Sequence, residues 1–291
     1  MSKEESGVRF SEKYVAFIDI LGFKSLVELA EKGEQCSLQT VLDILDSFNE
    51  SNYVKDMKKY GPSICPRSQR NADDLNFFIT QASDSVVASC EVSPAGLINL
   101  IFYSWQVVFK LLMEGLLCRG YITKGSMYHS ADRFVGSAFQ KAVEKEKTVQ
   151  AFKKELTENG TPFVEIDQLL IDDIDKFEDK CVREMSNRMV EKDGSIAVIF
   201  PFKRLSHDFI PSGYGKKFDP REEKENVENL RKEINELKEK VLKFIDGKSE
   251  LAMKKTKYYL EALDRQLLVC DQTDQHIDML ASPLGYRRRE K

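Results

Sequence analysis

One stretch near the start of the chain constrains the fold more than any other. Residues 14–20 (Tyr-Val-Ala-Phe-Ile-Asp-Ile) form an almost unbroken apolar run, which is typical of a strand buried on both faces. Asp19 is the only charged residue in this run, and Gly22 follows it and permits a tight turn. The sequence therefore predicts a buried strand that ends with a carboxylate at the rim of a sheet.

A second carboxylate stands between two further apolar runs. Residues 75–83 and 85–90 are mostly apolar, and Asp84 separates them. Two such runs joined by a short polar break predict a hairpin with the aspartate at its tip. We expect Asp84 to lie half-desolvated at a sheet rim, where it can meet another carboxylate such as Asp19.

The remaining pattern predicts an α+β sandwich, in which helices stack on a mainly antiparallel sheet. Ser25 is a candidate cap for a short helix that ends near Gly33, and Ser37 is a candidate cap for a longer one. Ser93 and Pro94 form a strong helix start, because proline suits the first helical position. Further elements are expected as a loop at 58–74, strands at 117–128, 134–135, 163–174 and 195–202, and a helix at 137–147.

The composition changes after Phe218. Apolar residues then recur every three or four positions among Glu and Lys, which predicts a heptad-like helix that Gly247 ends and a second helix after it. We expect a first domain at 1–215 and a C-terminal helical hairpin and tail at 216–291. The hairpin packs either on its own domain or on a second subunit, and the sequence leaves both open. The apolar positions are Val227, Leu230, Ile234, Leu237, Val241 and Phe244 in the first helix, and Leu251, Tyr259, Leu263 and Leu267 in the second.

Charge and composition exclude several classes of protein. The formal net charge of −4 gives no electrostatic reason to expect nucleic acid or an anionic membrane as a partner. The first residues lack an apolar signal segment, and the longest apolar stretch, 97–112, is too short and too polar to span a bilayer. The six cysteines form no C-x-x-C pair, so neither a zinc site nor a redox motif is expected. We expect a soluble cytoplasmic protein.

Asp19 and Asp84 together suggest a site for divalent cations. Two carboxylates at one rim can hold a pair of Mg²⁺ or Mn²⁺ ions, and paired metals suit chemistry on a nucleoside triphosphate. The Ile20 carbonyl is a natural extra oxygen ligand. The turn through Phe23 and Lys24 opens a helix, so its backbone N–H groups can receive phosphate oxygens. The competing interpretation is that both residues are ordinary turn aspartates.

Four blocks of the sequence, in this order, resemble the class III nucleotide cyclases. Residues 17–23 (Phe-Ile-Asp-Ile-Leu-Gly-Phe) resemble the first metal-binding segment, and Asp84 resembles the second metal aspartate, with Ser83 in place of a glycine. Residues 119–125 resemble the strand after the central helix, and residues 136–142 the helix that carries catalytic residues to the partner's site. The resemblance implies a ferredoxin-like sheet and a homodimer with composite active sites.

The detailed residue pattern of these blocks resembles one bacterial branch, the pyrimidine cyclases of Pycsar anti-phage systems. This branch shares the Phe-Ile-Asp-Ile-Leu-Gly-Phe segment, the Ser-Asp-Ser hairpin and the Arg-Gly-x-Ile strand. The resemblance implies conversion of UTP or CTP to the 3′,5′-cyclic monophosphate and pyrophosphate. The product would be a second messenger that activates a separate effector after phage infection. UTP is favoured over CTP on this resemblance alone.

Several positions depart from the purine cyclases of the family. Thr80 stands where they carry a lysine, four residues before the second metal aspartate, and Arg133 lies near their base-selecting aspartate. Gln140 and Glu144 fall near their asparagine and their transition-state arginine. Adenine or guanine recognition as the family performs it is therefore not preserved.

The missing arginine leaves the charge that develops during phosphoryl transfer without its usual partner. Arg133 and Lys141 are the candidate replacements, with Lys124 behind them, although each is also interpretable as a surface charge. The rival functions are a cytidylate cyclase, an inactive cyclase-like module that binds a nucleotide or a protein, and a purine cyclase. We expect catalytic roles for Asp19, Asp84, Arg133 and Lys141, and substrate contacts from Phe23, Lys24, Thr80 and Gln140.

Overall fold

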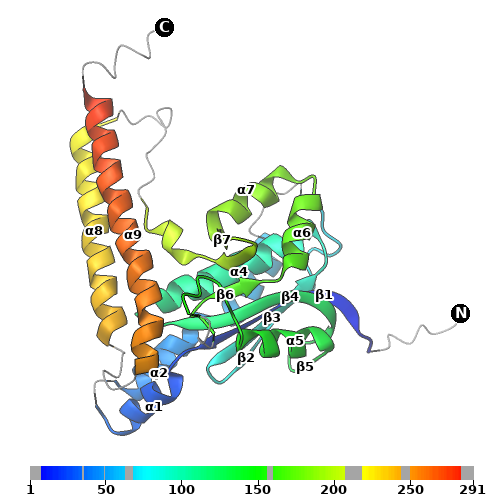
Figure 1. Ribbon diagram of the computed structural model, residues 1–291. Helices are drawn as coiled ribbons and strands as arrows, with labels where there is room; N and C mark the ends of the chain where they lie inside the picture. The colour runs from blue at the N-terminus through cyan, green and yellow to red at the C-terminus, as the bar shows by residue number, and fades with distance from the viewer. Residues whose placement is uncertain are drawn as a thin grey trace, which may run out of the picture. The chain divides into compact units, whose positions relative to one another are not determined.

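The computed structural model describes residues 8–34, 36–48, 50–62, 68–155, 160–206, 218–243 and 250–282 (Figure 1). The chain forms two compact units. One consists of residues 1–111 with 116–200, and the other of residues 112–115 with 201–291. The first unit contains the described strands, so the sheet and the predicted site residues belong to it.

An eight-stranded sheet forms the first unit, with the strand order β2-β3-β1-β4-β6-β8-β7 and β5 paired with β4. Its first half has the chain order β1, helices, β2, β3, helix, β4, with every neighbouring pair antiparallel. This is the split βαβ arrangement of ferredoxin-like sheets, as predicted. The strands are β1 (Ser11–Ile20), β2 (Phe78–Ala82), β3 (Ser85–Glu91), β4 (Cys118–His129), β5 (Phe134–Val135), β6 (Val164–Ile166), β7 (Val190–Asp193) and β8 (Ile196–Ile199).

Helices cover both faces of this sheet. On one face, the Tyr14 hydroxyl of β1 donates to Asp173 in α6, and Cys90 of β3 contacts the Gly96 carbonyl in α4. On the other face, Ala138 of α5 packs into a buried cluster with Val15. The helices of this unit are α1 (Phe23–Glu31), α2 (Leu38–Leu45), α3 (Glu50–Tyr60), α4 (Pro94–Met113), α5 (Ser137–Glu146), α6 (Gln168–Lys176) and α7 (Lys180–Met189).

Strand β1 pairs along its length with β3 on one side and β4 on the other, which is why its sequence is apolar at nearly every position. Side chains alternate along it, so Val15, Phe17 and Asp19 face the α5 side while Tyr14 and Ile18 face the α4 side. Asp19 is therefore on the same face of the sheet as α5.

Helix α4 is long and apolar enough to cross a membrane by length and composition, alone among the described helices. Of its apolar window, 67% is buried inside the protein, as in a core helix. Its start is the predicted one, because the Ser93 hydroxyl accepts a hydrogen bond from the Gly96 N–H.

Three sequence-based predictions of elements are corrected by the structure. The first helix begins at Phe23 rather than at a Ser25 cap, because Gly22 adopts a left-handed conformation (φ 79°) that turns the chain immediately after β1. The loop expected at 58–74 begins later, since α3 continues to Tyr60. The strand expected at 163–174 ends at Ile166, because the next residue caps α6 with its side chain.

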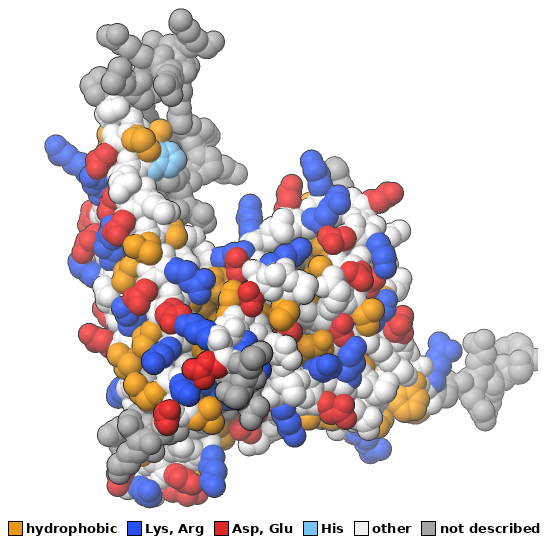
Figure 2. Space-filling model, in the orientation of Figure 1, with side chains coloured by type: hydrophobic (Ala, Val, Ile, Leu, Met, Phe, Trp, Pro, Cys, Tyr) orange, Lys and Arg blue, Asp and Glu red, His pale blue; other side chains and the backbone are white. Residues whose placement is uncertain are grey.

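The second unit contains the predicted helical hairpin, α8 (Pro220–Lys243) and α9 (Glu250–Ala281). Arg231 in α8 bonds Asp271 (2.7 Å) and Asp274 in α9, and Lys224 pairs with Asp278 (2.6 Å). On the face shown in Figure 2, basic and acidic side chains are intermixed along the hairpin. The buried side chains between them include Val227, Ile234, Leu237 and Val241 from α8, and Tyr259, Ala262, Leu263, Cys270 and Ile277 from α9.

One of the apolar residues predicted for the hairpin interior is exposed instead. Leu251 is 57% exposed at the start of α9, while Leu230 and Leu267 are half-buried. Phe244 and Gly247 lie outside the described residues. Tyr259 packs edge-to-face against Phe202, with ring centroids 5.1 Å apart.

Gly120 allows β1 and β4 to approach closely, and its replacement tests that packing. An added Cβ would lie 2.3 Å from the Phe17 carbonyl oxygen, a backbone atom that cannot move aside. We expect Gly120→Ala to reduce the free energy of unfolding by about 2–4 kcal/mol, measured by urea denaturation followed by circular dichroism. Gly125→Ala is the control, because its Cβ would lie 3.3 Å from the Ala138 methyl carbon and at least 3.7 Å from the Ala138 backbone. Equal losses in the two variants would contradict this explanation.

Candidate active site

The end of β1 and the tip of the β2–β3 hairpin form one rim of the sheet. Asp19 lies opposite Ser85 of β3 and opposite Arg119 of β4. The next residue, Ile20, donates its N–H to the Asp84 carbonyl oxygen (3.1 Å). The two predicted metal-binding aspartates are thus brought together from positions 65 residues apart in the chain.

The carboxyl group of Asp19 has a strongly perturbed acidity. Burial, together with the negative charges of Asp84 and Glu146, raises the pKa of Asp19 to about 7, although the positive charge of Arg119 opposes this shift. Burial and a like-charged neighbour both disfavour the ionised form of this carboxyl group. A cation that binds in place of the proton stabilises the ionised form. The site therefore favours a cation on electrostatic grounds.

A buried ion pair lies beside Asp19 and was not predicted. The Arg119 Nε donates to Glu146 of α5, whose side chain is 4% exposed. Because Arg119 is already neutralised by Glu146, it only partly offsets the charge of Asp19. Glu146 could have been found from the sequence, since Ala138, Ala142 and Glu146 recur every four residues and all three are buried in α5.

The turn after β1 presents the start of α1 to the same rim. The Leu21 N–H donates to the Leu117 carbonyl (2.9 Å), which fixes the turn against β4. Gly22 precedes α1, and no side chain caps this helix. The first N–H groups of α1 thus have no capping side chain, as suits phosphate binding. Phe23 is buried and Lys24 is 91% exposed, so Phe23 can offer substrate only its backbone N–H.

A divalent cation fits the donor set at this rim. Asp19 and Asp84 supply carboxylate oxygens, the ligands that hard cations prefer. Among the described residues, no group of three or more His, Cys, Asp or Glu side chains forms a metal cluster. A cation held here would take its other ligands from backbone carbonyls, water and substrate phosphates, as Mg²⁺ commonly does. Ile20 is the predicted carbonyl ligand.

The basic side chains that were predicted to stabilise the developing charge lie away from Asp19 within the same chain. Arg133 is in the turn between β4 and β5, 80% exposed, and pairs with Asp132 (3.2 Å). Lys141 of α5 pairs with Asp167, which also accepts from the Thr123 hydroxyl (2.6 Å). Burial alone would raise the pKa of Asp167, but the bonds from Lys141 and Thr123 outweigh it and hold that pKa below its usual value.

Two further candidates are likewise placed away from Asp19. Lys124 points to the opposite face of the sheet, where it pairs with Asp173 (3.1 Å). Gln140 is exposed on α5. Neither these residues nor Arg133 and Lys141 are among the charges that shift the Asp19 pKa.

Thr80 is held by a buried histidine. Its hydroxyl lies 3.0 Å from His129 Nε2, and the Ser89 hydroxyl lies 2.8 Å from Nδ1 of the same ring. Burial lowers the pKa of His129 to about 4, so the ring is neutral at pH 7. The sequence pattern does not predict this hydrogen-bond network, because its three residues come from three separate strands.

Neither a known family model nor a curated protein matches the sequence. Among solved structures, the chain is similar to the catalytic core of a rhodopsin-guanylyl cyclase with converted specificity in complex with ATPalphaS. The identity is 10% and the TM-score 0.36, over 66% of this chain and 96% of that one. A TM-score this low establishes neither a shared fold nor a shared activity.

The raised pKa of Asp19 predicts a pH-dependent stability. Ionisation of this carboxyl is disfavoured in the folded state. Without metal, the folded protein therefore loses no stability from this group below about pH 4, and it loses increasing stability as the pH rises to about 7. In EDTA, we expect the melting temperature of Asp19→Asn relative to the wild type to rise by at least about 2 °C between pH 4 and pH 8.

Asp73→Asn is the control, because the Asp73 side chain is 99% exposed and pairs only loosely with Arg70 (3.5 Å). Its melting temperature relative to the wild type should change less between pH 4 and pH 8 than that of Asp19→Asn. A pH-independent difference for Asp19→Asn would show that Asp19 is not desolvated at this rim.

Proposed function

We propose that the chain is a metal-dependent nucleotide cyclase that converts UTP to 3′,5′-cyclic UMP and pyrophosphate. The observation that carries the proposal is the meeting of Asp19 and Asp84 at one rim, directly before the start of α1. Carboxylates for cations and N–H groups for phosphate oxygens are the two requirements of a triphosphate site. The alternative product, cyclic CMP from CTP, uses the same groups.

Each part of the rim has a role in this proposal. Asp19 and Asp84, with the Ile20 carbonyl, would hold two Mg²⁺ or Mn²⁺ ions. When bound, such ions lower the pKa of the ribose 3′-hydroxyl and neutralise the charge of the triphosphate. The N–H groups at Phe23 and Lys24 would orient the phosphates through hydrogen bonds from the start of α1.

The reaction exchanges one phosphorus–oxygen bond for another. The ribose 3′-oxygen loses its proton to water and bonds to the α-phosphorus, while the bond between the α-phosphorus and the bridging oxygen breaks and releases pyrophosphate. The chain contributes by holding the reacting groups in line and by excluding water from the half-buried side of Asp19.

The surroundings of Thr80 support a base other than a purine. Where the purine cyclases carry a lysine, the Thr80 hydroxyl bonds His129, which is neutral. No positively charged side chain therefore stands at position 80 to recognise a purine. The preference for UTP over CTP, the role in anti-phage defence and the separate effector follow from the sequence resemblance alone.

A homodimer with composite sites is part of the proposal. In one chain, Arg133 and Lys141 make ion pairs away from Asp19. In a head-to-tail dimer, α5 of one subunit would serve the rim of the other, and the two sites would be equivalent by symmetry. Arg133 is then the better candidate for the developing charge, because it is exposed while Lys141 is held by Asp167.

A second candidate function is an inactive cyclase-like module that binds a nucleotide. The observation in its favour is that no described cation other than Arg119 shifts the Asp19 pKa, and Arg119 is neutralised by Glu146. A module of this kind would bind a triphosphate with metal and release it unchanged.

Product analysis separates these functions. The purified chain is incubated with each of the four nucleoside triphosphates and Mn²⁺, and products are identified by mass spectrometry. We expect cyclic UMP as the main product, with cyclic CMP second. Dominant cyclic AMP or GMP would contradict the pyrimidine assignment. No cyclic product from any substrate, with the protein folded and dimeric, would contradict the enzyme.

Removal of either carboxylate tests the metal site. Asp19→Ala and Asp84→Ala should each reduce kcat by about 10³-fold, because the charge developing on the phosphates loses its stabilisation. Circular dichroism should show an unchanged fold, and Asp73→Ala should keep full activity. Near-normal turnover in either site variant would remove the two-metal assignment.

Mixing two inactive variants tests the composite site. If Arg133 acts across the dimer, Asp19→Ala and Arg133→Ala chains each lack activity alone but form mixed dimers with one intact site. Random assortment should then restore about a quarter of wild-type activity. Absence of recovery, with exchange of subunits shown by mass spectrometry, would place both residues in a site within one chain.

A further inference from the structure

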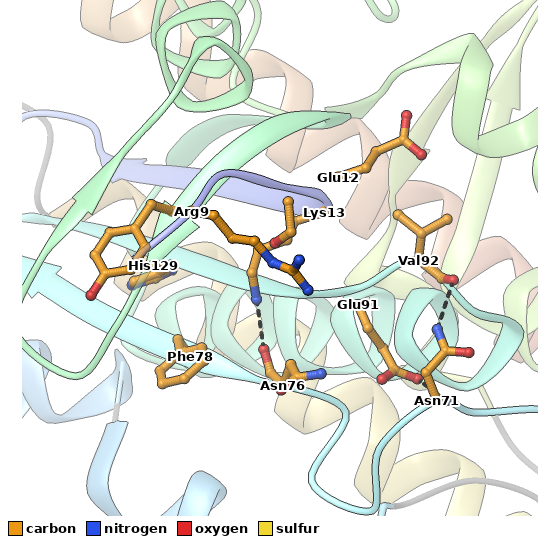
Figure 3. Close-up of a pocket in the computed structure, with 11 residues that line it drawn as sticks. Arg9, Glu12, Lys13, Asn71, Asn76, Phe78, Glu91, Val92 and His129 are labelled. Carbon is orange, nitrogen blue, oxygen red and sulfur yellow. Dashed lines mark hydrogen bonds between the residues drawn. The ribbon is translucent and has the colours of Figure 1, made fainter. Parts of the chain in front are cut away.

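A second cavity opens on the same face of the sheet as Asp19, but at the opposite end of β1. It encloses about 420 Å³. It lies six residues from Asp19 along β1, about 20 Å away at the rise of a strand, so it is separate from the carboxylate rim. Its lining includes Arg9, Lys13, Asn76, Phe78, Glu91 and His129 (Figure 3).

One side of the cavity carries two cations. Lys13 is 6% exposed and donates to the Asn76 carbonyl oxygen (3.0 Å), which leaves its other N–H groups for a ligand. The Arg9 guanidinium makes no ion pair with any described residue of the chain. Figure 3 shows both side chains entering the cavity from the β1 side. Together they can receive a carbonyl oxygen and an anionic group.

The other side carries an incompletely bonded carboxylate. Glu91 is 6% exposed, and its Oε1 accepts from the Asn71 N–H (2.6 Å) and the Ser93 hydroxyl (2.7 Å). Its Oε2 is buried and has no hydrogen-bond partner among the described residues. A buried carboxylate oxygen without a donor is costly, so the cavity is built to receive an N–H or O–H group at this point.

Two flat rings line the space near these polar groups. Phe78 and His129 lie with ring centroids 5.6 Å apart at 34°. His129 is fixed by Ser89 and Thr80, so it is a rigid, neutral part of the wall. The Lys13 ammonium lies 5.1 Å from the centre of the Phe78 ring. The Lys13 ammonium thus stands over the Phe78 ring, and a planar ligand that lies beside these rings can reach Lys13 with its edge.

We propose that this cavity binds a nucleoside monophosphate, with the base inside and the phosphate at the mouth. A base carries an N–H donor for Glu91 Oε2, a carbonyl oxygen for Lys13 and a flat ring that fits beside Phe78 and His129. The exposed Arg9 would meet the phosphate. The volume lies at the small end of the range for ligand pockets, which suits a mononucleotide. This site does not depend on the cyclase reaction.

Calorimetric titration tests the proposal on the full chain. UMP, CMP, AMP and GMP are titrated in EDTA, which removes the cations that a triphosphate site needs, and the matching nucleosides and inorganic phosphate are titrated separately. We expect at least one monophosphate to bind with a Kd below about 100 μM, at least about tenfold tighter than its nucleoside or phosphate alone. No binding below 1 mM by any monophosphate would overturn the proposal.

Three variants locate the ligand. Arg9→Ala, at an exposed residue that leaves the fold intact, should weaken the monophosphate about tenfold and leave the nucleoside unchanged. Glu91→Gln keeps the shape and the acceptor at Oε1 but should weaken both ligands at least about fivefold. Lys176→Ala, at an exposed residue of α6 with no role in either site, is the control for a general loss of positive charge.

The double variant Asp19→Asn, Asp84→Asn separates this site from the carboxylate rim. Its affinity for the monophosphate should equal that of the wild type. Loss of binding in the double variant together with normal binding in Arg9→Ala would place the ligand at the rim and overturn the second site. Phosphate alone binding as tightly as the nucleotide would overturn the role of the base.

Discussion

Hydrogen bonding of β1 on both of its edges is the constraint on which the rest of this chain depends. A strand paired on two sides and covered on two faces tolerates almost no polar side chain, which explains its apolar sequence. Asp19 stands within this setting, opposite Ser85 on one neighbour and Arg119 on the other. Its desolvation is therefore a result of the topology, and the perturbed acidity follows from it.

The parts of the fold that the sequence predicted well are those set by local signals. The β2–β3 hairpin follows from two apolar runs separated by Asp84, and α4 from the pairing of a cap at Ser93 with Pro94. Ser37 caps α2 as expected, accepting from the Thr40 N–H. Each of these depends on residues within a few positions of one another, so no knowledge of the packing is needed.

The parts that sequence reasoning missed depend on distant residues. The run at 163–174 is apolar enough for one long strand, but Asp167 ends it, since its carboxylate caps α6 and also bonds Lys141 and Thr123. The ion pair of Lys141 with Asp167 was not predicted for the same reason, because Asp167 lies 26 residues away in the chain. Glu146 went unnoticed because its partner, Arg119, lies on another element.

The turn that carries Asp84 differs in kind from the strand that carries Asp19. Ser83 adopts a left-handed conformation (φ 56°), which costs a non-glycine residue about 1–2 kcal/mol. The Gln81 side chain bonds the Ser83 carbonyl (3.1 Å), and Ser85 bonds the Ala82 carbonyl (2.9 Å), so local contacts offset the strain. Asp19 is thus held in a strand that is paired on both sides, whereas Asp84 lies in a two-residue turn with a strained backbone. In the proposed two-metal site, the position of Asp84 therefore depends on a turn of two residues, whereas the position of Asp19 depends on both neighbouring strands.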